Sequence, residues 1–430
     1  MARQMKDSGV EWIGVIPKEW RIGRVKNGFV RKNEKAEQDN PRILSLARSG
    51  VKIRDVSTGE GQIAESYYNY NPVDVGDLLL NPMDLYSGAN CSVSKISGVI
   101  SPAYMNLCAK EEFDSRYYDY YFKTQYWSMV LFAHGKGVSF DNRWTLNAET
   151  LFSYYIPIPS KKEQQKIAEF LDEKVGEIDS VIAKTKDTIE DYKKYKQAII
   201  TETVTKGLNP DVEMKGSKNE YLGRIPTHWG EKRLRFLGVC QNGISKSSEY
   251  FGEGYPFVSY GDVYKNPALP EKGSGLIRSN EDDRNTYSVR YGDVFFTRTS
   301  ETIEEVGFAS TCLKTIDDAT FAGFIIRFRP NDQEELIPEF SKYYFRSDAH
   351  RKFFVKEMNL VTRASLSQEL LKKLPALLPP IAEQKEIANF LDKKCSEIDK
   401  LVVKKEELLA DLESYKKSLI YEYVTGKKEV

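Results

Sequence analysis

The sequence EQQKIAEFLDEKVGEID at residues 163–179 returns as EQKEIANFLDKKCSEID at residues 383–399. The two segments lie 220 residues apart without a gap, and 11 of their 17 positions are identical. That distance is far longer than the period of solenoid repeats, which is roughly 20–50 residues. The repeat therefore predicts a duplicated unit that is used twice in one chain. Each copy begins a long segment whose polar and apolar residues alternate as in a helix.

Apolar residues follow a heptad spacing through both long segments, with polar residues at two equivalent positions. The first seam is Leu171, Val175, Ile178, Ile182, Ile189, Tyr192 and Ile199, interrupted by Thr185 and Lys196. The second seam is Leu391, Cys395, Ile398, Val402, Leu409, Leu412 and Leu419, interrupted by Lys405 and Lys416. A heptad seam of this length is typical of coiled coils. Because the two seams match, we expect the two helices to pack against each other.

The start of each helix has its own signal. Ser160-Lys161-Lys162-Glu163 predicts a capping box, and Pro379-Pro380 takes that place in the second copy. At about 1.5 Å per residue, a helix from Gln164 to Thr205 would be roughly 60 Å long. The sequence therefore predicts a strut that sets the distance between two domains.

The composition is that of an ordinary globular protein. With 430 residues, the chain is long enough for two or three domains. It has no apolar run of membrane-spanning length and no apolar signal segment near residue 1, so we expect a cytoplasmic protein. Five scattered cysteines favour free thiols in a reducing compartment, and three histidines far apart in sequence offer little for a metal site.

The net charge of zero hides an uneven distribution. Residues 163–191 carry nine acids and four bases, whereas residues 341–374 carry eight bases and three acids. This asymmetry fits one acidic and one basic face, and it fits solvated helix surfaces equally well.

The regions before the two helices also match each other. EWIGVIPKEW at 11–20 corresponds to EYLGRIPTHW at 220–229, and packing of the tryptophan is the favoured interpretation. Residues 29–155 alternate short apolar runs with turns, which predicts a mixed α/β domain, and residues 114–132 suit one amphipathic helix. Residues 230–378 repeat this plan, and the matched positions are Gly76-Asp77 with Gly292-Asp293, and 120–123 with 343–346. Because the scaffolds match while the loops differ, we expect two recognition domains with different targets.

Three segments resemble catalytic motifs only in part. PDVEMK at 210–215 places its acids two residues apart in a linker, unlike a nuclease metal site, whose acids stand on separate strands. NPMD at 81–84 lacks the second proline and the base-stacking aromatic of amino-methyltransferases. GEG at 59–61 and at 252–254 is interpreted as a turn, because no helix with Lys-Ser/Thr follows. We therefore expect no covalent chemistry from this chain. The hypothesis of a self-sufficient enzyme is disfavoured.

Two variable domains, each followed by a proline-led helix that begins EQ-x-x-IA-x-FLD, resemble the specificity (S) subunit of type I restriction–modification systems. The resemblance covers essentially the whole chain. It implies a mixed α/β (α+β) fold in which two target recognition domains are separated by two long antiparallel helices, which form a coiled coil with pseudo-twofold internal symmetry. The implied boundaries are 1–156 and 209–378 for the target recognition domains, and 157–208 and 379–430 for the helical regions.

The resemblance also implies a function. Each target recognition domain would read one half of a bipartite double-stranded DNA site, while the paired helices set the spacer and bind two modification (methyltransferase) subunits. Restriction (translocase–nuclease) subunits would join that core. DNA adenine methylation and DNA cleavage, with S-adenosylmethionine, ATP and Mg²⁺, would belong to the partners, so no cofactor and no metal are expected in this chain.

Candidate DNA contacts are polar and basic residues in the loops, because cations bind phosphates and a few side chains read base edges. In the first domain they are Ser45, Arg48, Lys52, Arg54, Asn81, Lys136 and Arg143. In the second domain they are Ser259, Arg298, Thr299, Arg363 and Ser365. Arg143 of the first copy and Arg363 of the second copy occupy equivalent positions. Because the arginine is shared, it suits phosphate or scaffold contacts better than base reading.

Helix pairing and partner docking are assigned to the repeated segment itself. Its candidate residues are Glu163, Gln164, Ile167, Phe170, Leu171, Ile178, Glu383, Gln384, Ile387, Phe390, Leu391 and Ile398. An acidic face for a partner would consist of Glu169, Asp172, Glu173 and Glu177. The alternative is a non-catalytic coiled-coil adaptor with two protein-binding domains, since divergent loops fit that as well. The basic region at 341–374 favours DNA.

Overall fold

The computed structural model describes residues 3–57, 64–83, 85–86, 90–137, 144–300, 306–357 and 364–430. The chain divides into two compact units: unit 1 is Met1–Lys186 with Glu407–Val430, and unit 2 is Asp187–Glu406. The division cuts both long helices, so each unit contains a globular part and a stretch of each helix. Candidate Arg143 and candidate Arg363 lie outside the described residues.

The globular part of unit 1 is built on a four-stranded antiparallel sheet in the order β4-β11-β8-β9. Its strands are β4 (Phe29–Lys32), β11 (Met105–Ala109), β8 (Leu78–Leu80) and β9 (Cys91–Val93). Four strand pairs surround it: β1 (Met5–Asp7) with β2 (Val15–Pro17), β3 (Arg21–Arg24) with β12 (Tyr155–Ile158), β5 (Leu44–Ala47) with β6 (Gly50–Ile53), and β7 (Asn71–Val73) with β10 (Gly98–Ile100). The short helices are α1 (Val25–Gly28), α2 (Ser115–Trp127), α3 (Val130–Ala133) and α4 (Ala148–Ser153).

Unit 2 repeats this sheet with the order β16-β23-β19-β21. Its strands are β16 (Gly238–Asn242), β23 (Ile325–Pro330), β19 (Val294–Thr297) and β21 (Ala309–Thr311). The equivalents of the first strand pairs are β13 (Met214–Gly216) with β14 (Arg224–Pro226), and β15 (Gly230–Arg233) with β25 (Pro375–Leu378). The helices are α6 (Tyr260–Lys265), α7 (Glu281–Thr286), α8 (Pro338–Tyr344), α9 (Asp348–Glu357) and α10 (Gln368–Lys373), with 3-10 turns η1 (Leu234–Phe236) and η2 (Ser248–Tyr250).

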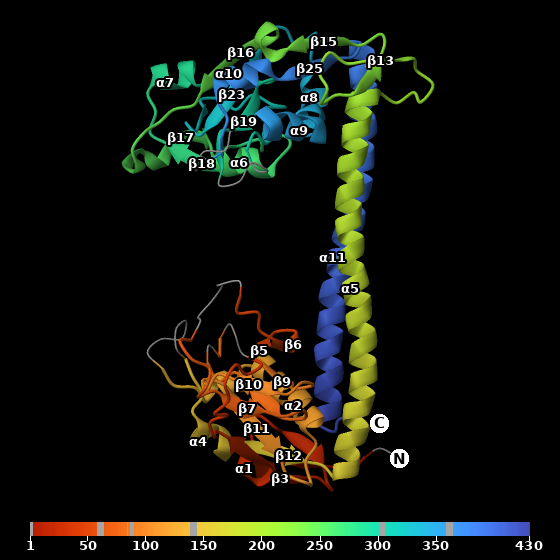
Figure 1. Ribbon diagram of the computed structural model, residues 1–430. Helices are drawn as coiled ribbons and strands as arrows, with labels where there is room; N and C mark the ends of the chain where they lie inside the picture. The colour runs from red at the N-terminus through yellow and green to blue at the C-terminus, as the bar shows by residue number, and fades with distance from the viewer. Residues whose placement is uncertain are drawn as a thin grey trace. The chain divides into compact units, whose positions relative to one another are not determined.

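Unit 2 also has a second small sheet with its own core. This sheet has the order β18-β17-β22, from β18 (Gly275–Ile277), β17 (Phe251–Val258) and β22 (Thr320–Phe321). A short pair, β20 (Thr299–Ser300) with β24 (Ala364–Ser365), completes the unit. The counterpart of the second sheet in unit 1 is the hairpin β5–β6, which meets β10 in a parallel bridge between Ile43 and Val99 and also has its own small core. Figure 1 labels β17 and β18 in unit 2 and β5, β6 and β10 in unit 1.

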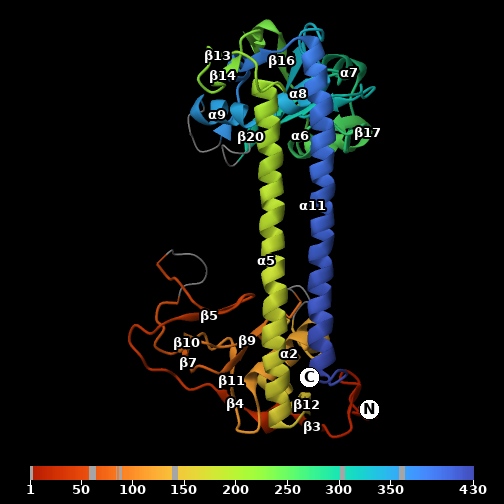
Figure 2. The same ribbon diagram turned by 90° about the vertical axis from the view of Figure 1, so that its right-hand side faces the viewer.

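The two long helices are α5 (Lys161–Lys206) and α11 (Ile381–Val424). Because α5 begins in unit 1 and ends in unit 2, while α11 does the reverse, the two helices run antiparallel where they lie side by side (Figure 2). The predicted seam residues Leu171, Ile178 and Leu419 are buried in unit 1, and Leu391 and Ile398 are buried in unit 2. The predicted mixed α/β fold with two long antiparallel helices is confirmed.

Matching ion pairs explain one of the two polar interruptions of the seam. In unit 1, Lys416 Nζ on α11 lies 2.6 Å from Asp179 Oδ1 on α5. In unit 2, Lys196 Nζ on α5 lies 2.6 Å from Asp399 Oδ2 on α11. Lys416 lies 220 positions after Lys196, and Asp399 lies 220 positions after Asp179. The same ion pair is therefore made twice, once in each unit.

Two local expectations are wrong. Residues 114–132 do not form one helix, because α2 ends at Trp127 and Met129 adopts a left-handed φ of 62° before α3 begins. The capping box at Ser160 is only half formed: Ser160 Oγ accepts a hydrogen bond from Glu163 N, but the Glu163 carboxylate binds Trp20 and Arg3. Among the described residues, no helix combines the length and apolar character that a membrane crossing requires.

Candidate nucleic-acid interface

The hairpin β5–β6 of unit 1 is a basic surface element. Residues 42–54 contain four cations and no acid: Arg42, Arg48, Lys52 and Arg54. Leu44 and Leu46 on one face of the hairpin belong to a small core with Val73, Leu79 and Ile100. Because side chains alternate along a strand, the cross-strand pair Ser45 and Lys52 lies on the other face. The structure therefore brings together the candidates Ser45, Arg48, Lys52 and Arg54.

The remaining described candidates of unit 1 lie elsewhere. Asn81 follows β8 and forms a turn, in which its Oδ1 accepts a hydrogen bond from Met83 N at 3.0 Å and its carbonyl accepts one from Tyr126 Oη at 2.9 Å. Lys136 is exposed and pairs through its backbone with Thr145. Asn81 thus has a structural role within unit 1, while Lys136 is a separate surface cation.

In unit 2, three candidates meet at the short strand pair β20–β24. Thr299 lies directly opposite Ser365. The backbone of Arg298 holds this pair in place, since its N–H donates to Phe324 O at 2.9 Å and its carbonyl accepts from Leu366 N at 2.7 Å. Ser259 lies apart from them: it is the N-cap of α6, and its Oγ donates to Asp262 at 2.9 Å, so it shapes the loop.

Among the described residues of the basic region at 341–374, several cations are already paired or buried. Lys342 pairs with Asp392, and Lys372 pairs with Glu369. The Arg346 guanidinium donates to the carbonyls of Val263, Tyr264 and Asn266 at the end of α6, and burial lowers the pKa of Arg346 to about 10. Arg351 lies over the rings of Phe308 and Phe354. Many of these cations therefore serve the fold of unit 2.

A surface that the sequence analysis missed lies on the second sheet of unit 2, β18-β17-β22. Lys246, Tyr250, Tyr255 and Arg278 line an open pocket of about 600 Å³. Lys246 Nζ lies 5.1 Å from the Tyr250 ring, and the guanidinium of Arg284 lies 3.8 Å from the Tyr255 ring. Gly252 and Gly254 both have φ of +104° and form a bulge in β17. The signal in the sequence is a pair of glycines flanked by aromatic residues, and a turn accounts for the glycines alone.

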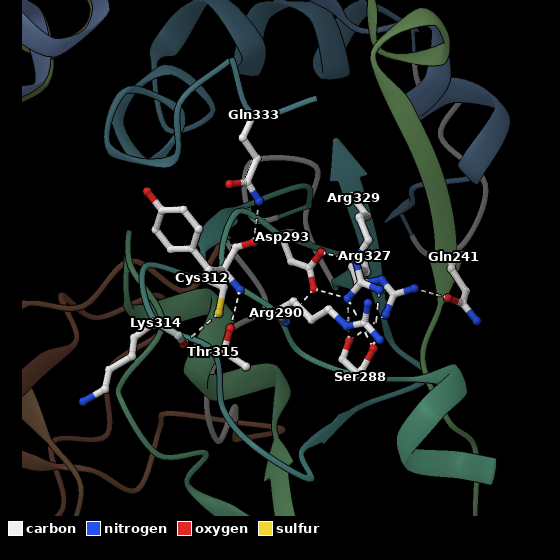
Figure 3. Close-up of polar contacts among 11 residues, drawn as sticks. Gln241, Ser288, Arg290, Asp293, Cys312, Lys314, Thr315, Arg327, Arg329 and Gln333 are labelled. Carbon is white, nitrogen blue, oxygen red and sulfur yellow. Dashed lines mark hydrogen bonds and ion pairs between the residues drawn. The ribbon is translucent and has the colours of Figure 1, made fainter. Parts of the chain in front are cut away.

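The two Gly-Asp motifs are structural. In unit 2, the buried Asp293 carboxylate accepts two hydrogen bonds from Arg329, each at 2.6 Å, and one from Arg290 N at 2.8 Å. Figure 3 shows Arg327 and Arg329 of β23 converging there with Ser288. In unit 1, the equivalent Asp77 binds Lys32 Nζ at 2.8 Å and Asp74 N at 2.8 Å. Each aspartate thus ties a turn to a basic residue of the central sheet.

The glutamate of each EQ pair holds the entry tryptophan of its unit. Glu163 accepts a hydrogen bond from Trp20 Nε1 at 2.9 Å, and Glu383 accepts one from Trp229 Nε1 at 2.9 Å. Both tryptophans are buried, which confirms the packing interpretation. A glycine with positive φ ends each long helix close to these rings: a Cβ on Gly426 would lie 3.0 Å from Trp20, and one on Gly207 would lie 3.3 Å from Trp229. The two helix ends and the entry segment therefore meet at one anchor in each unit.

The glutamine of each EQ pair is fully buried and makes the same three hydrogen bonds in both units. Gln164 accepts from Asp114 N at 2.8 Å and donates to the carbonyls of Glu112 and Pro159. Gln384 accepts from Ile337 N at 3.0 Å and donates to the carbonyls of Glu335 and Pro379. Burial of both side chains leaves them no surface for another subunit, so their role lies inside each unit.

The other helix candidates divide between the globular parts and the seam. The buried ones are Ile167, Leu171, Ile178, Ile387, Leu391 and Ile398. Phe170 is half-buried with its ring centroid 4.5 Å from that of Tyr423, and Phe390 packs on the core of unit 2. In the predicted acidic face all four acids are exposed, and Asp172 also accepts a hydrogen bond from Tyr120 Oη at 2.9 Å.

This duplicated scaffold, with two anchored helices and unlike loops, is that of a DNA specificity protein. The chain belongs to the family of type I restriction modification DNA specificity domains, whose sequence model matches residues 91–191 and 227–409. A putative type I restriction enzyme MjaX specificity subunit of Methanocaldococcus jannaschii is 24% identical over 448 residues, which cover 97% of this chain and 96% of that protein. The EcoBI specificity subunit of Escherichia coli is 22% identical, over 94% of this chain and 84% of its own length.

Solved structures share the fold. A chain from a study of complex assembly and conformational transition of the type I R-M system superposes with a TM-score of 0.72 at 15% identity, covering 96% of this chain and 99% of that chain. The HsdS subunit from Thermoanaerobacter tengcongensis gives a TM-score of 0.51 at 15% identity, covering 96% and 98%.

Proposed function

We propose that this chain recognises DNA sequence for a type I restriction–modification complex, and that each globular part reads one half of a bipartite site. The observation that carries the proposal is the contrast between the copies: the same sheet and the same helix anchors support unlike surfaces. Unit 1 offers the acid-free hairpin β5–β6, and unit 2 offers the β20–β24 pair and the β17–β18 hairpin with its exposed aromatic residues. Unlike surfaces on one scaffold suit two unlike half-sites.

The chemistry of these surfaces fits duplex DNA. Arg48, Lys52 and Arg54 can pair with phosphates and supply affinity that is independent of sequence. Ser45 and Lys52 on the outer face of the hairpin can reach base edges in the major groove. In unit 2, Arg298, Thr299 and Ser365 offer the same combination of a cation and hydroxyl groups. We assign base reading to these residues and phosphate contacts to their neighbours.

The two long helices set the distance between half-sites and bind two methyltransferase subunits, one at each copy. This part of the proposal is supported by exposed apolar side chains at equivalent positions: Val181 and Tyr195 of α5, and Leu401 and Tyr415 of α11. Each pair is separated by two heptads, which is the spacing of a stripe that another helix can cover. Methylation, cleavage and their cofactors, S-adenosylmethionine, ATP and Mg²⁺, belong to the partner subunits.

Methylation mapping of DNA from cells that carry this chain with its methyltransferase subunit tests the proposal. The expected result is one split motif with a fixed gap. If no new methylation motif accompanies the chain, the proposal is wrong.

A coiled-coil adaptor with two protein-binding domains is the second candidate, because the exposed tyrosines of both helices also suit protein contacts. The chain and a methyltransferase subunit are mixed with duplex DNA in a gel-shift series across salt concentrations. Binding that weakens steeply with salt supports DNA recognition, whereas a complex of the two proteins that never shifts DNA supports the adaptor.

A further inference from the structure

A pocket of about 470 Å³ lies within unit 1, beside the basic hairpin and against the long helices. Its polar lining comes from the hairpin turn, from β9 and the residue before it, and from α2, α5 and α11. The polar residues include Arg48 of the hairpin turn, Asn90, Ser92 of β9, Lys123 of α2, Asp179 of α5 and Lys416 of α11. The pocket therefore connects the candidate DNA surface to the C-terminal helix.

The lining carries more positive than negative charge. Three cations, Arg48, Lys123 and Lys416, face one lining acid, Asp179. Among the described residues, Lys123 Nζ makes one hydrogen bond, to Asp119 Oδ2 at 2.6 Å, and Lys416 Nζ makes one, to Asp179 Oδ1 at 2.6 Å. Since an ammonium group has three donors, both lysines keep donors for a further acceptor.

In unit 2 the position that corresponds to this pocket is filled by other contacts of the chain. Arg346 is the counterpart of Lys123, and Ala309 of β21 is the counterpart of Cys91, which lines the pocket in unit 1. Arg346 donates to Ala309 O at 2.6 Å and to three carbonyls at the end of α6. The cation of unit 2 is thus surrounded by acceptor oxygens of its own chain, whereas in unit 1 the hairpin turn leaves a pocket open.

We infer that the unit 1 pocket binds a phosphate of the DNA backbone, so that α11 takes part in DNA binding through Lys416. This inference rests on the proposed function. Arg48 and Lys416 supply positive charge from two different elements. Asn90 donates one amide proton to Ala47 O and has a second one for a ligand, and this combination suits a phosphate group. We assign this phosphate to duplex DNA that lies next to the hairpin. Free inorganic phosphate is the competing ligand.

The internal repeat supplies a matched control. Lys416→Met and Lys196→Met each remove a lysine with a 2.6 Å ion pair between α5 and α11. Only the first removes a lining group of the pocket. The chain is assembled with its methyltransferase subunit, and binding to a duplex with the mapped motif is measured across salt concentrations.

Lys416→Met should weaken binding about tenfold and lower the slope of log affinity against log salt by about one, since one phosphate contact is lost. Lys196→Met should keep the wild-type slope, and Arg48→Ala on the exposed turn should repeat the effect of Lys416→Met. Equal affinity and slope for Lys416→Met and Lys196→Met overturn the inference.

Two further outcomes separate the possible failures. Calorimetric titration with inorganic phosphate is run on the wild-type complex and on Lys416→Met. Suppose that the wild-type complex binds free phosphate, that Lys416→Met abolishes this binding, and that the salt slopes for DNA are unchanged. The pocket then binds a free anion, and the assignment to DNA is overturned. If the wild-type complex binds no bipartite duplex at all, the proposed function itself is wrong.

Discussion

At the scale of single residues, two buried glutamines connect the start of each long helix to the globular part of its unit. Gln164 and Gln384 are fully buried, yet each satisfies a backbone N–H and two carbonyls of its own unit. Buried polar groups of this kind are costly to leave unpaired. The repeated EQ pair therefore attaches the start of each long helix to the globular part of its unit by hydrogen bonds.

Gln164→Leu should destabilise unit 1 by about 2–4 kcal/mol, because it leaves Asp114 N and two carbonyls without partners in a buried place. Hydrogen exchange of the amides in α2 and of Asp114 measures the loss. Gln384→Leu is the matched control: it should raise exchange around α8 in unit 2 and leave α2 protected. Unchanged protection of Asp114 in Gln164→Leu would contradict the prediction.

His350 adds a pH dependence to unit 2. Its ring is fully buried against Tyr344, and burial lowers its pKa from 6.5 to about 3. The unfolded chain therefore binds a proton that the folded chain does not bind between these two values. Stability from this group is complete above pH 6.5 and is lost as the pH falls toward 3, by about 1.4 kcal/mol per pH unit.

His350→Gln should flatten this dependence. Urea unfolding of the wild type and the variant, followed by a unit 2 probe at pH 7.5 and at pH 5, gives the comparison. The stability difference between the two proteins should shrink at the lower pH. A difference that is the same at both pH values would exclude His350 as the source.

At the scale of elements, the paired helices are held in register by charges as well as by apolar contacts. Lys196 with Asp399, and Lys416 with Asp179, are the two copies of one interaction. Partly exposed ion pairs stabilise a protein by about 0–1 kcal/mol, so we expect these two pairs to add little to stability and to act mainly on the register of the helices.

Charge reversal tests this register. Lys196→Glu places two acids together at Asp399 and should lower the free energy of unfolding by roughly 1 kcal/mol, and adding Asp399→Lys should restore most of it. A double-mutant cycle from urea unfolding measures the coupling. A coupling energy of zero would show that the apolar seam alone holds the register.

The same elements show how far sequence could carry the prediction. The repeat, the heptad seam and the entry tryptophans predicted both long helices and their packing, because these depend on local periodicity. Contacts between distant segments could not be read in this way. Trp20 meets Glu163 across 143 positions, and Lys342 meets Asp392 across 50. A basic run such as 341–374 predicts a DNA surface only if its partners elsewhere in the chain are known.

At the scale of the whole molecule, each globular part should control one half of the DNA target. Lys52→Ala and Ser45→Ala in unit 1 should relax or change one half of the methylated motif, while Thr299→Ala and Ser365→Ala should affect the other half. Each lost base contact should cost about 1–3 kcal/mol of discrimination.

Methylation mapping of cells with these variants gives the readout. Phe236, an exposed aromatic of η1, provides a control in unit 2, and Phe236→Ala should leave the motif unchanged. If a variant in one unit alters both halves of the motif, the assignment of one half-site to each unit is wrong.

The division of the chain also has a consequence for the order in which the protein can fold. Unit 2 is one continuous stretch, Asp187–Glu406, whereas unit 1 needs residues 407–430, which the ribosome makes after all of unit 2. Ile420 and Val424 fill the core of unit 1, and Val424 O accepts a hydrogen bond from Tyr117 Oη at 2.8 Å. Unit 1, whose first residues are made first, therefore cannot complete its core until residues 407–430 have been made. Unit 2 is able to fold before that. A nascent chain stalled after residue 406 should protect unit 2 from protease before unit 1, which reverses the usual order of synthesis.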